Sequence, residues 1–215
     1  MEISSDNYLL YNLPDLEVMK SDSLFEYSIW QPDKLYIVLG RANTPERSIF
    51  TDIAQKDGVN IIRRDTGGES VVLSPGMLVF SSKITLLKHE RPGTIFRIIN
   101  DQLINSFERV GVKGLYSKGI SDLSVNNRKV LGSSMYLKGK TLFYHAVLNI
   151  KEDVSIISKY LKHPKREPDY RGGRSHNEFI TSLHKEGILF DNSTLKEAIS
   201  DAFNKIYTIL GENMK

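Results

Sequence analysis

The segment that decides the interpretation of this chain reads Ile61-Ile62-Arg63-Arg64-Asp65-Thr66-Gly67-Gly68-Glu69-Ser70-Val71-Val72. An apolar pair leads into paired arginines, a glycine pair bends the chain, and a second apolar run follows. Glycine permits backbone angles closed to other residues and lets the backbone approach a ligand closely. The planar guanidinium of arginine fits carboxylate and phosphate groups. The pattern predicts a basic turn between strands that cradles an anion, although an ordinary hairpin turn with solvated arginines fits the same residues.

The composition indicates a single soluble domain over residues 1–215. Hydrophobic residues make up 40% of the chain and charged residues 26%, which suits a globular protein with a sizeable core. The formal net charge of +3 is too small to indicate a nucleic-acid partner, but it is compatible with an acidic protein partner. Because the chain has no cysteine, a disulfide, a thiolate metal site and a cysteine nucleophile are all excluded.

The sequence also predicts where the protein works. The first residues, Met1-Glu2-Ile3-Ser4-Ser5-Asp6, lack the basic region and apolar run of a signal peptide. No apolar run approaches the roughly 20 residues needed to span a bilayer. We therefore expect a cytoplasmic protein without membrane association.

Hydrophobic patterning outlines the first part of the fold. Residues 7–29 are mixed, and a loose helical rhythm from Asp15 to Tyr27 predicts one or two short helices. A near-continuous apolar run at residues 35–39 predicts a buried strand, and a helix is expected near residues 47–56. Further strands of the same sheet are predicted at residues 59–64, 70–73 and 77–83.

A longer helix and an antiparallel meander are predicted next. Apolar residues recur at helical spacing after Thr94, the expected N-cap, and Gly111 is expected to end the helix. Turn residues at 126–128 and 138–140 predict two hairpins over residues 120–150, with Lys129 just past the first turn.

The last part of the chain is predicted to be mostly helical. A short helix is expected at residues 154–161, and Pro and Gly residues predict a loop over residues 163–176. Thr194 and Glu197 form a capping-box pattern that opens a final helix, with Ile209 among the residues of its apolar face. The fold class that follows is α/β (α+β), a single domain with a mixed, largely antiparallel sheet flanked by helices.

Four segments, in order, carry a resemblance to a known family. Arg63-Arg64-Asp65-Thr66-Gly67-Gly68 resembles the Arg-Arg-x-Ser/Thr-Gly-Gly-Gly-Ala-Val signature of the lipoate–protein ligase A family. Gly119–Leu123 with Arg128–Ser134 resembles the Asn-Asp-Ile and Lys-Ile-Ser-Gly-Ser-Ala segments of that family. Phe143–Leu148 is similar to its His-His-Gly-Thr-Leu strand, and Val38–Asn43 to its Val-Ile-Gly-Arg-x-Gln segment. The resemblance covers roughly residues 30–150 and implies a biotin/lipoate protein ligase-like catalytic domain.

The resemblance implies acyl activation followed by transfer. In that family, the carboxylate of lipoate or octanoate attacks the α-phosphate of ATP, with Mg²⁺, and forms an acyl-adenylate. A lysine of a lipoyl carrier domain then attacks the mixed anhydride and releases AMP. The implied carriers are the E2 component of a 2-oxoacid dehydrogenase and an H-type protein of glycine cleavage.

Site residues follow position by position from the resemblance. Lys129 matches the catalytic lysine, which stabilises negative charge on the acyl carbonyl and phosphate. Asp122 matches an acid associated with magnesium. The implied adenylate- and lipoate-binding residues are Arg64, Thr66, Gly67, Gly68, Glu69, Ser70, Gly132, Ser133 and His145. A solvated strand lysine, a turn-capping aspartate and a core histidine are the alternatives for Lys129, Asp122 and His145.

A second basic stretch follows the meander and lies where the ligases carry a mobile loop near the adenylate. We expect it to act as a lid or as a docking site for the carrier, with a solvated surface loop as the alternative. Its residues are Arg166, Arg171, Gly172, Gly173, Arg174, Ser175 and His176.

Several positions depart from the family pattern. Glu69 stands in place of the third glycine, Ser70 in place of the following alanine, and Ser121 in place of the asparagine before the acid. Leu73 and Met77 replace a histidine and an asparagine. The chain also ends without the C-terminal accessory domain of the longer ligases, so we expect that either an accessory subunit replaces it or the catalytic domain alone suffices.

These departures keep three functions open. The first is an ATP-dependent lipoate–protein ligase. The second is a cysteine-independent lipoyl or octanoyl transferase that uses a preformed acyl donor. The third is a non-catalytic carrier-binding subunit. A biotin ligase is disfavoured because its Gly-Arg-Gly-Arg motif is absent.

Overall fold

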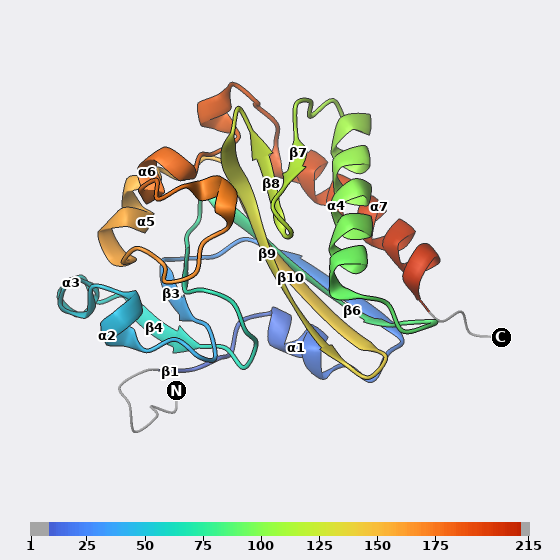
Figure 1. Ribbon diagram of the computed structural model, residues 1–215, viewed down its shortest axis with the longest axis horizontal. Coiled ribbons are helices and arrows are strands. Elements are labelled where there is room, and N and C mark those ends of the chain that lie inside the picture. The colour runs from blue at the N-terminus through green and yellow to red at the C-terminus, as the bar shows by residue number, and fades with distance from the viewer. Residues whose placement is uncertain (1–8, 212–215) are drawn as a thin grey trace.

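Residues 9–211 form two β-sheets (Figure 1). The structure, a computed structural model, describes residues 9–211. The larger sheet is antiparallel throughout, with the strand order β2-β6-β10-β9-β8-β7. Its strands are β2 (Phe25–Trp30), β6 (Met77–Thr85), β7 (Tyr116–Lys118), β8 (Asp122–Val125), β9 (Arg128–Lys138) and β10 (Thr141–Asn149).

The smaller sheet is mixed and has the order β1-β4-β3-β5. β1 (Leu9–Leu10) and β3 (Tyr36–Leu39) run parallel to β4 (Asn60–Arg63), whereas β5 (Val71–Leu73) runs antiparallel to β3. The fold class is thus confirmed, but the expectation that all strands continue one sheet is wrong. The turn at Pro75-Gly76 sends the chain from the small sheet at β5 into the large sheet at β6, and Gly76 is packed tightly there, since a Cβ would lie 2.8 Å from the Glu152 amide nitrogen.

The two long helices cover one face of the large sheet. α4 (Pro92–Arg109) and α7 (Asn192–Leu210) lie side by side against it (Figure 1). Alternate residues of β6 and β10, among them Phe80 and Tyr144, are fully buried beneath them and meet the ring of Phe203. Burying a large apolar side chain contributes about 1.5–3 kcal/mol, so this face holds the main core. The side chains between those alternate residues point to the opposite face of the sheet, which the long helices do not cover.

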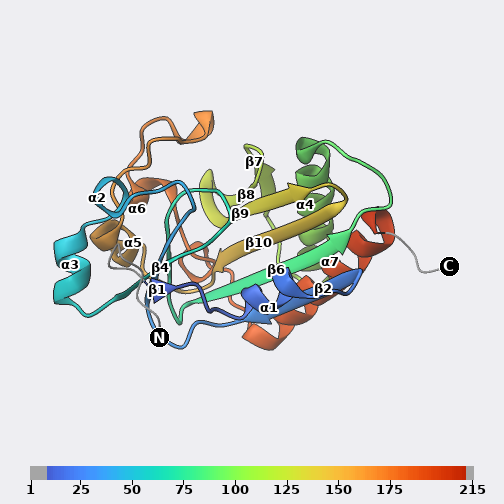
Figure 2. The same cartoon turned by 90° about the horizontal axis from the view of Figure 1, so that it is seen from below.

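The short helices lie at the other side and end of the molecule. α1 (Asp15–Lys20) packs against β2 and β6, on the face opposite the long helices (Figure 2). The remaining elements are α2 (Pro45–Ser48), α3 (Thr51–Lys56), α5 (Ser155–Tyr160), η1 (Asp169–Arg171), α6 (His176–Phe179) and η2 (His184–Glu186). α5 contacts both α3 and α6.

Most of the predicted helices and strands are present. The wrong predictions concern where an element begins or ends and whether a segment is a helix or a strand. The purely helical reading of residues 7–29 is wrong, because Phe25–Trp30 is a strand paired with β6. The helix expected near residues 47–56 is divided into α2 and α3 by Ile49, which is buried and bridges to Leu161.

The predicted helix caps are also corrected. α4 begins two residues before Thr94, with Arg91 as its N-cap. α7 is capped by Asp191, whose carboxylate accepts the Thr194 N–H, and Ile209 is 50% exposed. Across residues 9–211, no helix combines the length and the apolar character needed to cross a membrane.

Candidate active site

A cavity of about 660 Å³ lies against the face of the large sheet that the long helices leave uncovered. Register explains its floor: Gly132 pairs with Val147 and Ser134 with His145, so these four residues share one face of β9 and β10. Val79 of β6 pairs with Val147 and extends the same surface. The glycine turn, the small sheet and the 162–180 segment supply the remaining walls.

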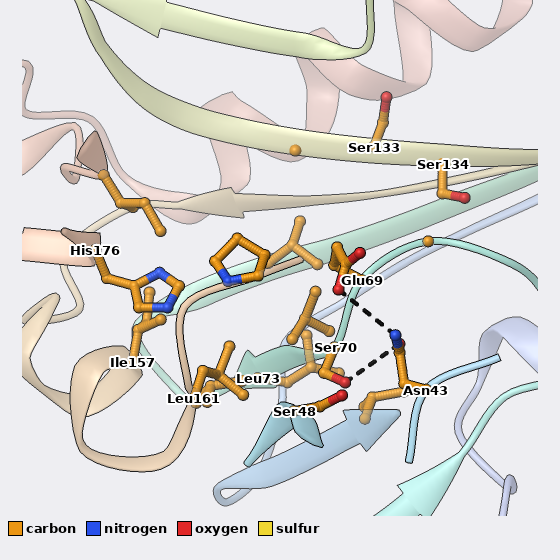
Figure 3. A pocket seen from close by; sticks show the side chains of 18 of the residues that line it. Asn43, Ser48, Glu69, Ser70, Leu73, Ser133, Ser134, Ile157, Leu161 and His176 are labelled. Carbon is orange, nitrogen blue, oxygen red and sulfur yellow. Dashed lines mark hydrogen bonds between the residues drawn. The ribbon is translucent and has the colours of Figure 1, made fainter. Parts of the chain in front are cut away.

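One part of the cavity is apolar. Leu73 comes from β5, Ile157 from α5, and Leu161 follows α5; Figure 3 shows them grouped on the same side as His176. Val72, Met77, Phe179 and Ile180 also line the cavity. A surface of this kind suits a hydrocarbon chain, which polar walls would leave poorly solvated.

Arg64 supports the glycine turn from beneath. Its side chain is buried, and its guanidinium donates to the carbonyl oxygens of Gly67 and Glu69 at 3.0 and 2.9 Å. Gly68 has a φ of +100°, and a Cβ there would stand 2.8 Å from the guanidinium of Arg64. The carbonyl of Gly68 in turn would lie 2.0 Å from a Cβ at Gly40. The alternative interpretation, a solvated arginine, is therefore wrong for Arg64. This residue lines the cavity and holds the turn in shape.

The residues after the turn are tied to the loop that follows β3. Asn43 lies with its amide nitrogen 3.5 Å from a carboxylate oxygen of Glu69, and its amide oxygen accepts from Ser70 at 3.3 Å (Figure 3). The same oxygen accepts the Gly40 N–H at 3.0 Å. Glu69 and Ser70 line the cavity, whereas Gly67 does not. Asn43 belongs to the Val38–Asn43 segment that resembles the family, but it was not predicted as a site residue. Its amide side chain, two residues after Gly40-Arg41, was the feature that could have indicated its role.

Lys129 extends into the cavity from the start of β9. Its ammonium lies 2.8 Å from a carboxylate oxygen of Asp122, and its side chain is 27% exposed. The backbone is held on a second side, because the Thr181 N–H donates to the Lys129 carbonyl at 2.9 Å. A freely solvated strand lysine is thus excluded, and the sequence placed this residue correctly.

Gly132 and Ser133 build the surroundings of this lysine. The aliphatic end of Lys129 lies over Gly132, where a Cβ would stand 2.5 Å from the lysine Cε. Ser133 donates to the Ser121 carbonyl at 2.7 Å and so fastens β9 to the residue before β8. Ser134, which the sequence interpretation passed over, donates to the Gly67 carbonyl at 3.2 Å and connects β9 to the glycine turn.

Asp122 has both carboxylate oxygens engaged. One pairs with Lys129, and the other accepts a hydrogen bond from the Tyr170 hydroxyl at 2.7 Å. Within the described part of the chain, no cluster of three or more His, Cys, Asp or Glu side chains is arranged to hold a metal ion. The contacts make Asp122 a counter-ion to Lys129, and its predicted role toward magnesium stays a prediction.

His145 lines the cavity as part of a buried polar cluster. Its Nδ1 lies 3.7 Å from a carboxylate oxygen of Asp15, and its Nε2 lies 3.5 Å from the Thr66 hydroxyl. The Tyr11 hydroxyl donates to the other oxygen of Asp15 at 2.5 Å. Burial lowers the pKa of His145, which favours the neutral imidazole. Tyr11 and Asp15 come from the N-terminal segment, where the sequence offered no motif.

Hydrogen bonds to backbone carbonyls and an ion pair hold the second basic stretch in place. Arg171 is buried, donates to the Arg174 carbonyl at 2.9 Å, and lies 3.3 Å from Glu167. Arg174 donates to the carbonyls of Asn127 and Tyr170, both at 2.9 Å. Arg171 is thus buried and the guanidinium of Arg174 is occupied by backbone carbonyls, while the lid or docking role of this stretch stays a prediction.

The other residues of this stretch have separate positions. Ser175 caps α6 in a capping box with Glu178. His176 lines the cavity, its Nε2 is 3.1 Å from the Lys162 carbonyl, and burial lowers its pKa. Arg166 is exposed at the cavity rim together with Lys165.

Comparison with known proteins places this geometry in a family. The family model of the lipoyl protein ligase A/B catalytic domain matches residues 5–204. The chain belongs to this family. The resemblance drawn from the sequence is thereby confirmed, and the cavity described here is the catalytic-domain cavity of a lipoyl protein ligase A/B member.

Solved structures of lipoate-protein ligases share the fold at low identity. A bi-partite lipoate protein ligase from Thermoplasma acidophilum, studied with its E2 lipoyl domain, is 18% identical with a TM-score of 0.73, over 87% of this chain and 72% of that one. A lipoate-protein ligase A bound with ATP is 17% identical with a TM-score of 0.74, over 90% and 78%. The lipoate complex of Plasmodium falciparum LipL1 is 20% identical with a TM-score of 0.67, over 89% and 52%.

Proposed function

We propose that this protein is an ATP-dependent lipoate–protein ligase. It joins lipoate or octanoate to AMP and then transfers the acyl group to a lysine of a lipoyl carrier domain. The observation that carries the proposal is the position of Lys129. Its ammonium is mounted on a strand inside a cavity that also has an apolar part and a glycine turn.

Each half-reaction develops negative charge that this lysine can stabilise. In the first, a carboxylate oxygen attacks the α-phosphorus and pyrophosphate leaves. In the second, the carrier amine attacks the acyl carbon, AMP leaves, and a proton is released. A fixed positive charge beside the reacting atoms lowers the energy of both transition states. The backbone of Lys129 lies on β9 and accepts a hydrogen bond from the Thr181 N–H, which keeps that charge in place.

The substrates follow from the walls of the cavity. The apolar part formed by Leu73, Ile157 and Leu161 suits the acyl chain, and the backbone of the Gly67-Gly68 turn suits the phosphate. Mg²⁺ would be held mainly by the phosphates of ATP, and Asp122 is the protein carboxylate predicted to contact it. Structures that share this fold, one bound with ATP and one in complex with lipoate, support this assignment.

The carrier and the setting are also part of the proposal. One neighbour was studied with its E2 lipoyl domain, which supports an E2 or H-type carrier here. That neighbour is bi-partite, which supports an accessory subunit. The cytoplasmic setting expected from the sequence stays a prediction.

Glu69 favours a second candidate, a transferase that accepts a preformed acyl donor. A carboxylate that lines the cavity beside the glycine turn opposes the binding of a highly charged nucleotide. Acyl-adenylate carries fewer negative charges than ATP, so this opposition weakens for a preformed adenylate.

One experiment separates the two candidates. The purified protein is incubated with a lipoyl domain and either ATP with lipoate or synthetic lipoyl-adenylate, and the carrier mass is followed. Modification in both incubations supports the ligase, and modification from the adenylate alone supports the transferase. Absence of modification in both contradicts both enzymes and leaves a non-catalytic carrier-binding subunit.

A further inference from the structure

Tyr170 reaches the candidate catalytic lysine through one intermediate residue. The Tyr170 hydroxyl donates to one oxygen of Asp122 at 2.7 Å, and the other oxygen of that carboxylate lies 2.8 Å from the Lys129 ammonium. The Asp122 side chain is only 7% exposed, so water competes little for these contacts. Tyrosine, aspartate and lysine therefore form a chain that ends in the cavity.

The phenol ring is fixed on several sides. The Phe179 ring centroid lies 5.1 Å from the ring centroid of Tyr170, and the Lys118 ammonium lies 5.9 Å from the same centroid. Gly119 packs against the ring, because a Cβ there would stand 3.1 Å from a ring carbon. Burial, followed by the charge of Asp122, raises the pKa of Tyr170 well above its ordinary value, so the hydroxyl keeps the proton that it donates.

Tyr170 belongs to the segment that closes one side of the cavity. Pro168 and Arg171, its neighbours in and beside η1, line the cavity directly. Arg174 fastens the same segment to the β8–β9 hairpin through the carbonyl of Asn127. The segment and the hairpin that carries Lys129 are thus joined through the carbonyl of Asn127 and through the carboxylate of Asp122.

We propose that Tyr170 is a positioning residue for Lys129. By donating to Asp122, the phenol takes up part of the carboxylate's negative charge and leaves the lysine a weaker counter-ion. The ammonium can then turn toward the negative charge that develops on the substrate. Without the phenol, Asp122 competes more strongly with the substrate for the same ammonium. The catalytic meaning of this arrangement rests on the function proposed above, whereas the effect on the lysine itself does not.

The chain offers a matched control on the same hairpin. The Tyr116 hydroxyl accepts the Asn127 N–H at 2.8 Å, so Tyr116→Phe also removes one phenol hydroxyl from the β8–β9 turn. That variant leaves the contact between Tyr170 and Asp122 intact. A general loosening of the hairpin would affect both variants, and a positioning role affects only Tyr170→Phe.

The first test is a double-mutant cycle in single-turnover transfer from lipoyl-adenylate. Tyr170→Phe should slow transfer by about tenfold, the scale of one hydrogen bond to a charged group, with little change in the concentration of adenylate at half-maximal rate. In the Asp122→Asn background, Tyr170→Phe should have less than about a twofold effect, because the charge on which it acts is gone. Tyr116→Phe should stay within about twofold of the wild type. Equal effects of Tyr170→Phe in both backgrounds would overturn the proposal.

The second test needs no enzymatic activity. Acetic anhydride is applied in trace amounts to the ligand-free protein, and the acetylation rate of Lys129 is read by peptide mass spectrometry. Tyr170→Phe should acetylate about threefold more slowly, since a stronger counter-ion holds the ammonium, Asp122→Asn should acetylate faster, and Tyr116→Phe should match the wild type. If Tyr170→Phe also matches the wild type, the positioning role is refuted. If the wild type lacks transferase activity but the acetylation rates change as expected, the proposed function fails while the effect on the lysine stands.

Discussion

Gly132 and Lys129 are in contact across the surface of β9. A Cβ at position 132 would stand 2.6 Å from the lysine Nζ and 2.5 Å from its Cε, well inside the closest approach of real atoms. The lysine therefore lies where it does because position 132 has no side chain. The glycine and the lysine act as one structural pair, although the sequence pattern presents them as separate motif positions.

This contact gives the first prediction. Gly132→Ala should displace the lysine ammonium and slow transfer by about tenfold or more, because a displacement on the order of 1 Å at a reacting group is costly. The strand itself should tolerate alanine, with a loss of at most about 1–3 kcal/mol in the free energy of unfolding. Single-turnover transfer and urea unfolding are the two measurements. Gly93→Ala is the control, because a Cβ at Gly93 meets nothing within 4 Å; equal rates in the two variants would show that the contact does not matter for transfer.

The second prediction concerns the charge of Lys129. Lys129→Ala should slow both half-reactions by about 10²–10³-fold, the range for removing one preorganised electrostatic group. Lys129→Arg should restore little of this rate, because a planar fork does not replace a compact ammonium over Gly132. The measurements are pyrophosphate release from ATP and transfer from lipoyl-adenylate. Rates near wild type for Lys129→Ala in both would remove the lysine from the mechanism.

The third prediction concerns stability and pH. Burial lowers the pKa of His145 below its ordinary value of 6.5, so the folded protein binds fewer protons than the unfolded chain between the two pKa values. The free energy of unfolding should therefore be fully retained above pH 6.5 and should fall as the pH drops toward the folded-state pKa. His176 has the same direction of shift and adds to this slope.

Thermal unfolding between about pH 5 and 7.5 tests this prediction, since that range covers the ordinary pKa of histidine. His145→Gln should flatten the decline of Tm on the acid side, with His163→Gln as the control at a histidine whose side chain is 48% exposed. A wild-type Tm that is constant over this range, or an equal slope in His145→Gln, would contradict the assignment.

The fourth prediction concerns the docking of an acidic carrier at two cations of the 162–180 segment other than Arg171 and Arg174. Lys165 and Arg166 are the exposed cations of this segment at the cavity rim, where an acidic carrier would approach. Reversing both to Glu should slow transfer to the carrier more than formation of the adenylate, and added salt should reduce the difference between variant and wild type. A matched reversal of Lys138 and Lys140, exposed at the β9–β10 turn, is the control for net charge. Equal slowing of both half-reactions would instead assign Lys165 and Arg166 to the nucleotide.

The sequence predicted well the parts of the site that lie close together in the chain. The β8–β9 turn is an example, since Asn126 and Asn127 adopt positive φ angles of 47° and 59°, as a tight hairpin requires. That local signal placed Lys129 on its strand. Arg64 and its turn were found for the same reason, because the guanidinium contacts carbonyls only three to five residues away.

Contacts between distant segments could not be predicted in this way. Tyr170 is 48 residues from Asp122, and no motif joins them. Tyr11 and Asp15 reach His145 from the N-terminal segment, which carries a weak pattern of its own. The division into two sheets also escaped prediction, because an apolar strand such as β5 does not specify its partner strand. Side chains selected by tertiary packing leave little trace in a single sequence.

The last prediction concerns Glu69, the residue that separates the ligase from the transferase. Its carboxylate lies in the cavity wall, 3.5 Å from the Asn43 amide. Glu69→Gly should remove the repulsion toward the phosphates of ATP and increase ATP-dependent lipoylation, by about tenfold for one charge near a surface cleft. The rate from preformed lipoyl-adenylate should change much less, because the adenylate carries fewer negative charges.

Glu69→Gln separates charge from shape. It keeps the side-chain volume and the contact with Asn43 while removing the charge, so it should give most of the gain if electrostatic repulsion is the cause. A gain in Glu69→Gly alone would assign the restriction to the backbone of the turn, where a third glycine relaxes the chain beside Gly68. If both variants lose activity with either donor, the carboxylate assists the reaction. Glu69 then does not repel ATP and no longer favours the transferase.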